Sequence, residues 1–529
     1  MFDIQEWDGL AKIASFHVNG KTMVTPALFP VVDPKQQTAP IAEMKSRFGF
    51  DQVISSAYLM SKRLDHTAWT DYPSITEYLQ FDGLIMMDSG AYQVMLYGDI
   101  ELGIEDTIKL QTQVSTDIGV IMDHPIGYEV NYQEAKDRVN QTLSNIEASI
   151  PHLANTVTWT LPIQGGKYID LLRYYLTEIK ERGLIDHFGF FALGSVVQVM
   201  INQDYTTLVE MIAVARQYLP ENRPLHLFGA GHPAVFALAT FLGCDTFDSA
   251  AYALMAKDNR YMTVEGTYQL ENLNELPCHC PVCMAHTAKQ LLKMGRDKRQ
   301  RLLAEHNLYV SSGEIKLIRQ HIHDGNLWDL VMKRSNAVPN LALATRRAIE
   351  LVTEGELKNK YLAGIPVSKD SMPRITRIMD LSKPSVQRVG NLAFRSLFET
   401  TAPRLIILAF PGYRSIYNRV PDYQIEDYNT EKYLPCILLP SVGIFSIGAS
   451  ELYPLGQMIN EIAIKDLPQQ HIIHQLELLQ QAGKKITIYY TDAAMAEYFN
   501  RILKIHPEIQ VKQVPSLVTQ LNTVLVSEE

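Results

Sequence analysis

Short apolar runs alternate with segments of helical spacing between residues 26 and 248. In the helical segments, apolar residues recur every three or four positions, as they do at Val139, Leu143, Ile146 and Ile150. The short runs are rich in β-branched and aromatic residues, which is typical of buried strands. We therefore predict strands at residues 26–32, 52–56, 84–87, 118–122, 157–163, 187–193, 225–230 and 244–247.

Eight strand–helix units within roughly 250 residues predict an α/β fold, namely a (β/α)8 TIM barrel. A doubly wound open sheet would produce a similar alternation and is the alternative. We expect three regions: the barrel at residues 1–275, a zinc-binding knuckle with a helical region at 276–400, and a small α/β domain at 401–529. The last region contains two further strand-like runs, "PRLIILAF" and "KKITIYYT".

Polar residues or glycine follow most of the predicted strands at the point where each strand ends. Asp88, Asp123, Gln164, Gly194 and Asp248 all occupy such positions. A single aspartate after a strand is usually a helix N-cap. In a TIM barrel, however, the C-terminal ends of all strands meet at one mouth, and that mouth carries the active site. Three acids and a glutamine converging there predict a catalytic site.

Three of the five cysteines of the chain lie within "CHCPVCMAH", residues 278–286. A tight turn can direct such closely spaced thiolates at one tetrahedral ion, which then needs a fourth ligand. His279 and His286 are candidates, but His306 fits better because a helix can carry a distant ligand back to the knuckle. A reduced surface loop is the alternative. The predicted site is closed and therefore holds structural Zn²⁺, with the ligands Cys278, Cys280, Cys283 and His306.

The chain of 529 residues is 47% hydrophobic and 20% charged, an ordinary balance for a soluble globular protein. Its first residues, "MFDIQEWDGLAK", lack the pattern of a signal peptide, and no apolar run reaches the roughly 18 residues of a membrane span. We therefore expect a cytoplasmic protein without a membrane partner. The net charge of −10 argues against indiscriminate nucleic-acid binding.

Basic residues nevertheless cluster in the predicted helical region. The clusters are "KMGRDKRQR" (293–301), "MKR" (332–334) and "TRRAIE" (345–350). Such groups can contact the phosphates of a nucleic acid. They can equally belong to solvated helix faces, and both interpretations stay open at this point.

Several motifs together resemble the tRNA-guanine transglycosylase family, and most of all its archaeal, archaeosine-forming branch. The resemblance covers about residues 1–330, with the motifs in order and at sensible spacing, and a later stretch, "SIGASELYPLGQ" (446–457), extends it. The motifs are "MDSGAYQ" (87–93), "LPIQGGKYIDL" (161–171), "HLFGAGHP" (226–233), "FDSAAYALMAKDNRYMT" (247–263) and "CHCPVC" with the later "HNLY".

This resemblance implies a base exchange on tRNA without strand cleavage. In the archaeal branch, a D-loop guanine at position 15 is replaced by 7-cyano-7-deazaguanine. Displacing a purine from C1′ passes through oxocarbenium-like character, so a carboxylate beside C1′ can act as the nucleophile. By its position in "FDSAAY", Asp248 is implied to be that nucleophile. By its position in "DSGAYQ", Asp88 is implied to be the general acid/base.

The resemblance also implies how the base is recognised. Asp123 and Gln164 are similar to the base-recognition pair of the family, an acceptor and an amide that bind the edge of a guanine-like ring. Backbone groups around Gly194 and Ser195 would complete the pocket. A target guanine must leave its stack to reach the barrel mouth.

The resemblance further implies a homodimer formed through the zinc region. In the family, the full-length archaeal form ends in an RNA-binding PUA domain, and the last residues here do not resemble one. We therefore expect this tRNA-binding part either to be missing or to be supplied by a separate PUA-containing chain. We expect basic residues such as Arg299 and Arg301 to contact the tRNA. The alternatives are a DNA-modifying deazaguanine transglycosylase paralogue and a non-catalytic transglycosylase subunit; the presence of both Asp88 and Asp248 argues against the second.

Overall fold

In the computed structural model, eight parallel strands form one sheet whose two edges meet. Val31 and Ile54 form a parallel bridge between the edge strands, and the Val32 amide donates to the Ile54 carbonyl at 2.8 Å. The predicted (β/α)8 barrel is therefore confirmed, and every predicted strand belongs to it. Its strands are β4 (Ala27–Pro30), β5 (Gln52–Ser56), β6 (Leu84–Asp88), β7 (Ile118–Val120), β8 (Thr158–Ile163), β9 (Phe190–Leu193), β10 (Leu225–Leu227) and β11 (Thr246–Ser249).

The structure describes residues 1–33, 35–63, 74–92, 103–364, 373–410, 429, 431–451, 455, 458–460 and 462–517. Within them the chain forms two compact units, Met1–Gly364 and Ile365–Glu529. The three-region division with boundaries at residues 275 and 400 stays a prediction. In the described part of the chain, no helix is long and apolar enough to cross a membrane.

Helices connect the barrel strands, and most of them are amphipathic. In α6 the apolar positions at 139, 143 and 146 are buried, as the spacing predicts, and the side chain of Asn131 caps the first turn by accepting from the Glu134 amide. The connecting helices are α1 (Met44–Phe48), α2 (Ala57–Arg63), α3 (Ile75–Leu79), α5 (Ile104–Gln113), α6 (Tyr132–Ser149), α7 (Ile169–Glu181), α8 (Val196–Ile201), α9 (Tyr205–Tyr218) and α10 (Pro233–Phe241), and α11 (Ala251–Lys257) follows the last strand.

An antiparallel sheet precedes the barrel and has no counterpart among the predicted elements. It consists of β1 (Phe2–Asp8), β2 (Ala11–Val18) and β3 (Lys21–Thr25). Phe16 and Met23 from this sheet belong to the same buried cluster as Phe29 and Phe190 of the barrel strands. Because Phe29 and Phe190 lie inside the barrel, this sheet covers its N-terminal end, opposite the mouth.

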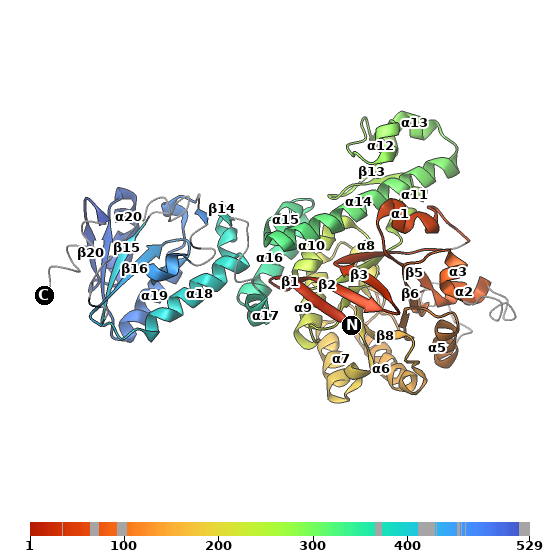
Figure 1. Cartoon of the computed structure of the whole chain (residues 1–529), viewed down its shortest axis with the longest axis horizontal. Coiled ribbons are helices and arrows are strands. Elements are labelled where there is room, and N and C mark those ends of the chain that lie inside the picture. Colours follow the sequence, from red (N-terminus) through yellow and green to blue (C-terminus); the bar gives the residue numbers. More distant parts are fainter. Residues whose placement is uncertain are drawn as a thin grey trace. The chain divides into compact units, whose positions relative to one another are not determined.

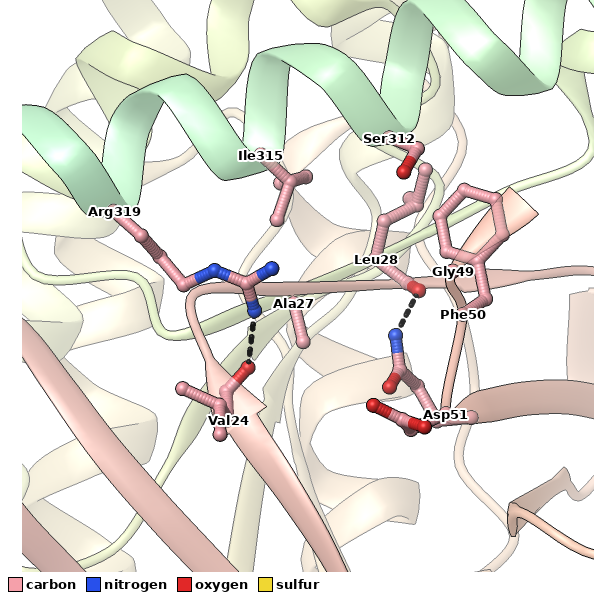
Figure 2. A pocket seen from close by; sticks show the side chains of 10 residues that line it. Val24, Ala27, Leu28, Gly49, Phe50, Asp51, Ser312, Ile315 and Arg319 are labelled. Atoms are coloured by element: carbon pink, nitrogen blue, oxygen red, sulfur yellow. Dashed lines mark hydrogen bonds between the residues drawn. The ribbon is translucent and has the colours of Figure 1, made fainter. Parts of the chain in front are cut away.

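A long helix, α14 (Arg296–Asp324), runs along the barrel and carries the cysteine-rich knuckle near its start (Figure 1). Its Arg319 donates to the Val24 carbonyl at 2.9 Å beside a small pocket (Figure 2). That pocket lies at the beginnings of β4 and β5, away from the mouth, and its volume of about 20 Å³ suits a water molecule rather than a base. The knuckle elements are β12 (Arg260–Met262), β13 (Thr267–Gln269), α12 (Pro281–Ala285) and α13 (Ala288–Lys293).

The remaining chain is helical up to the end of the first unit, with α15 (Leu327–Arg334), α16 (Pro339–Thr353) and α17 (Lys358–Ala363). The second unit contains a five-stranded sheet in the order β17-β16-β15-β19-β20, which confirms the small α/β fold. Its elements are β14 (Arg374–Ile375), α18 (Pro384–Glu399), β15 (Arg404–Ala409), β16 (Tyr433–Leu439), β17 (Gly443–Ser446), β18 (Ile459–Asn460), α19 (Gln470–Gln481), β19 (Lys485–Tyr490), α20 (Ala493–Ile505) and β20 (Gln510–Gln513).

Candidate active site and metal centre

The polar residues singled out in the sequence lie at the mouth of the barrel. Asp88 ends β6 and Asp248 lies on β11. Gln164 and Gly194 directly follow β8 and β9, and Asp123 lies three residues after the end of β7. The parallel order of the closed sheet brings these C-terminal ends together at one face. The site is thus built by strands that are far apart in the sequence.

Asp248 is held by two donors that contact the same carboxylate oxygen. The backbone N–H of Gly229 donates to Oδ1 at 2.7 Å, and Nε2 of His226 donates to Oδ1 at 3.1 Å. Gly229 has a left-handed backbone, with φ of 65°, and a Cβ there would lie 2.3 Å from a methyl carbon of Val197. Glycine therefore suits position 229, because it adopts this backbone conformation without strain and leaves room for the Val197 side chain of α8. The Asp248 side chain is 12% exposed.

Asp88 lies in an environment that favours its protonated form. Burial raises the pKa of its carboxyl group to about 7, and the negative charges of Asp248 and Asp123 act in the same direction. The N–H of Gly90, which donates to Oδ1 at 2.7 Å, opposes this rise. A carboxyl group with a pKa near 7 can both give and take a proton at neutral pH, which is what a general acid/base requires.

Asp123 and Gln164 form a hydrogen-bonded pair. Gln164 Nε2 donates to Asp123 Oδ2 at 2.5 Å, and burial raises the pKa of Asp123 to about 6 despite this bond. The amide is only 1% exposed, and a Cβ on Gly194 would come within 2.2 Å of Gln164 Nε2. Glycine at 194 therefore leaves the space that the Gln164 side chain occupies.

Ser195 takes part through its side chain, which the sequence did not suggest. Its hydroxyl donates to Gln164 Oε1 at 2.5 Å and accepts from the Ile126 N–H at 2.8 Å. The residue has a left-handed backbone, with φ of 61°. Ser195 thus fixes the orientation of the Gln164 amide, in addition to the backbone role expected for it.

The four predicted metal ligands converge on one point. The ligand atoms of Cys278, Cys280, Cys283 and His306 all lie within 4.8 Å of one another. His306 Nδ1 lies 3.5 Å from the Sγ of Cys280 and 3.3 Å from that of Cys283. Three thiolates and an imidazole with this spacing could hold a metal ion.

The surroundings of His306 prepare Nδ1 as the ligand atom. Its other nitrogen, Nε2, donates to the Met262 carbonyl at 2.9 Å, so Nδ1 is left with a free lone pair. The ring also stacks on Tyr261 with 3.8 Å between ring centroids. The alternative ligands His279 and His286 are absent from the group found among the described residues.

The basic residues near the knuckle divide into engaged and exposed groups. Arg299 Nε donates to Asn259 Oδ1 at 2.8 Å, and its Nη1 donates to two backbone carbonyls. Arg301 pairs with the buried Glu305 at 3.0 Å. The guanidinium group of Arg299 is therefore held within the fold, whereas the Arg301 side chain stays 53% exposed despite its ion pair. Lys293, Arg296 and Lys298 are exposed as well, and their side chains can meet a phosphate.

Comparison with known proteins gives one family and several relatives. The model of the family described as queuine tRNA-ribosyltransferase matches residues 8–340. Curated relatives named tRNA-guanine(15) transglycosylase come from Methanococcus aeolicus (40% identity, covering 66% of this chain and 54% of the relative), Methanocaldococcus jannaschii (34%, covering 86% and 68%) and Aeropyrum pernix (37%, covering 75% and 75%). The matched region therefore spans about half the length of the first of these relatives and three quarters of the last.

Proposed function

The chain belongs to the queuine tRNA-ribosyltransferase family, and on this premise we propose that it is a tRNA-guanine transglycosylase. It exchanges the guanine at position 15 of the tRNA D-loop for 7-cyano-7-deazaguanine, the base exchange of archaeosine biosynthesis. The observation that supports this proposal is that Asp248 and Asp88 lie together at the mouth of the barrel. One carboxylate is anchored and poised to attack, and the other has a pKa of about 7.

The reaction proceeds as two displacements at C1′ of the target ribose. An oxygen of Asp248 gives an electron pair to C1′, the bond from C1′ to guanine N9 breaks, and the leaving base takes up the proton of the Asp88 carboxyl group. The incoming base then returns a proton to Asp88, its N9 attacks C1′, and Asp248 is released as a carboxylate. Two displacements retain the configuration at C1′, and no proton is gained or lost overall.

Asp123 and Gln164 select the base. A carboxylate accepts from the ring N–H and exocyclic amino groups of a guanine-like base, and an amide can donate to its carbonyl oxygen. The hydrogen bond from the Ser195 hydroxyl keeps the Gln164 amide in one orientation. Backbone groups at Gly194 and Ser195 line the rest of the pocket. Guanine and 7-cyano-7-deazaguanine share the edge that these groups contact.

Zn²⁺ is the ion that the cysteine cluster holds. Three sulfur donors and one imidazole nitrogen form a closed tetrahedral set, which is the usual set of structural zinc. The ion stabilises the knuckle against α14, which carries His306, and it takes no part in the base exchange.

The substrate partner is tRNA in the cytoplasm. The exposed Lys293, Arg296 and Lys298 contact its phosphates, and the D-loop opens so that the target guanine can enter the mouth. A homodimer formed through the zinc region and a separate PUA-containing chain complete the set of proposed partners.

Radiolabelled guanine tests the proposal. The wild-type protein and an Asp248→Asn variant are each incubated with labelled guanine and either unmodified archaeal tRNA or duplex DNA. Label that enters tRNA with the wild type alone is the expected result. Label that enters DNA would assign the protein to a DNA-modifying paralogue. No label in either, even after a PUA-containing chain is added, would indicate a non-catalytic subunit.

A further inference from the structure

We propose that His226 is a positioning residue that anchors Oδ1 of Asp248 and thereby makes Oδ2 the atom that attacks C1′. The inference rests on the proposed function, because it assigns atoms within that reaction. His226 lies on β10 inside the barrel, and its side chain is fully buried. The sequence motifs imply no role for this histidine.

The strand register explains why the imidazole reaches Asp248. His226 pairs with Thr246 across the β10–β11 ladder. Thr246 and Asp248 are two residues apart on β11, so their side chains point to the same face of the strand. His226 Nδ1 lies 2.9 Å from Thr246 Oγ1, and Nε2 lies 3.1 Å from Asp248 Oδ1. The imidazole of His226 therefore contacts the Thr246 hydroxyl through one nitrogen and the Asp248 carboxylate through the other.

The tautomer of His226 follows from its partners. An ionised carboxylate only accepts hydrogen bonds, so Nε2 carries the hydrogen. The Thr246 hydroxyl can then donate to Nδ1, which leaves both ring nitrogens satisfied in the neutral imidazole. Hydrogen-bond donation from Thr246 thus selects the tautomer that can hold Asp248.

Two donors saturate Oδ1 and leave Oδ2 for chemistry. The Gly229 N–H and His226 Nε2 both contact Oδ1, and an oxygen of this kind has two lone pairs. Within the described part of the chain, Oδ2 of Asp248 has no hydrogen-bond partner. In the first displacement, Oδ2 supplies the electron pair for the new bond to C1′, and the electrons of the C1′–N9 bond leave with guanine.

An aromatic cage holds the imidazole itself in place. The rings of Phe29, Phe190 and Phe228 surround it, with centroids 5.8, 6.1 and 4.8 Å from that of His226. Rings packed in this way leave the imidazole little freedom to rotate. Because a nucleophile misplaced by about 1 Å can lose 100-fold in rate, a rigid anchor below Asp248 matters for catalysis.

Two amide substitutions at His226 test the inference as a matched pair. In His226→Gln the amide nitrogen can occupy the place of Nε2 and donate to Asp248. In His226→Asn the shorter amide reaches Thr246 but not Asp248. Both variants keep a polar group in the cage, so their stabilities, measured by thermal unfolding, should be similar.

The readout is the exchange of labelled guanine into tRNA, with kcat and KM measured separately. For His226→Asn we expect kcat to fall about 100-fold, while the KM values for tRNA and guanine stay unchanged, because Asp248 binds neither base nor phosphate. For His226→Gln we expect a loss of about fivefold or less. His226→Phe, which suits the aromatic cage and donates nothing, should behave like His226→Asn and replaces it if that variant does not fold.

Two results would overturn the inference while the proposed function stands: an active wild type with His226→Asn within threefold of its kcat, or equal losses in the folded Asn and Gln variants. The second would assign His226 to packing alone. An inert wild type, by contrast, would overturn the proposed function and the inference together.

Discussion

The two ends of the barrel both contain buried aspartates, but these acids have opposite surroundings. At the N-terminal end, Asp117 contacts Lys21 Nζ at 2.8 Å, and Asp245 lies 3.3 Å from Lys12 Nζ and 3.7 Å from Arg216 Nη1. At the mouth, Asp88 and Asp248 have backbone N–H groups and an imidazole as their partners. Among the described residues, no lysine or arginine forms an ion pair with either.

Under the proposed function, the same residue type serves structure at one end and chemistry at the other. A buried carboxylate beside a cation is neutralised, and its oxygens are fully used by the fold. A buried carboxylate without a cation costs free energy, raises its own pKa and keeps an oxygen or a proton available for a substrate. Burial raises the pKa of Asp88 and Asp123, as this comparison requires.

The largest expected effect is the loss of the proposed nucleophile. Asp248→Asn should lower kcat for guanine exchange by roughly 10⁴-fold or more, because the neutral amide cannot attack C1′. Its thermal unfolding should stay close to that of the wild type. Quantitative exchange assays on both proteins provide the measurement, and a variant that keeps a tenth of the wild-type rate would break the comparison.

The next largest effect is expected at Asp88, the proposed general acid. Asp88→Asn should slow guanine release by about 10²- to 10⁴-fold. In the wild type, single-turnover attack on tRNA without incoming base should slow as pH rises through about 7, since the proton that Asp88 gives is then lost. The variant should lack this pH dependence. A wild-type rate that is flat between pH 6 and 8 would contradict the role of Asp88.

A smaller effect, on stability rather than rate, is expected at the opposite end of the barrel. Asp245→Asn leaves the buried side chains of Lys12 and Arg216 without their anion. We expect a loss of about 3–5 kcal/mol in the free energy of unfolding, measured by denaturant titration. The kcat of the folded fraction should be unchanged. A variant with normal stability and reduced kcat would contradict the assignment of a structural role to the N-terminal end of the barrel and a catalytic role to the mouth.

The same comparison predicts that removing an acid from the mouth stabilises the protein. The pKa of Asp88 rises from 3.8 to about 7 on folding, so the folded state holds the proton more tightly, and its stability falls as pH rises through this window. At pH 8 the penalty is at most about 4 kcal/mol. Because Asp88 keeps some solvent contact, we expect Asp88→Asn to gain about 1–2 kcal/mol at pH 8 and little at pH 4. Denaturant titrations at the two pH values measure this gain, and equal stability at both would contradict it.

The smallest effect is expected from exposed basic residues that lie at neither end of the barrel. Replacing the exposed Lys293, Arg296 and Lys298 by alanine should weaken tRNA binding about fivefold at low salt, with guanine binding unchanged. Filter binding over a range of salt concentrations measures this effect. Arg299→Ala serves as the contrasting variant, because its guanidinium stabilises the protein internally, and it should lower the unfolding temperature instead.

The apolar pattern predicted the barrel well, because buried parallel strands are short apolar runs that alternate with amphipathic helices. The same pattern concealed His226. This histidine lies between Leu225 and Leu227 in a run that reads as an ordinary buried strand. Its contact with Asp248 depends on the register of β10 against β11, which no spacing in one sequence reveals.

Contacts between distant segments also explain the other differences. The side-chain role of Ser195 depends on Gln164, which lies on another strand connection. Arg299 stands in a basic run, yet the turn around Asn259 engages its guanidinium. The convergence of the four candidate ligands was predictable, because the three cysteines lie within six positions of the sequence and donor chemistry limits the choice of a fourth ligand.

Mapping of the covalent adduct tests the central claim most directly. Wild-type protein is incubated with unmodified tRNA in the absence of an incoming base, denatured and digested, and the peptides that carry ribose are identified by mass spectrometry. The account predicts an ester on Asp248 and none on Asp88, Asp123 or Asp245. An adduct on another carboxylate, or none from a preparation that exchanges labelled guanine, would contradict it.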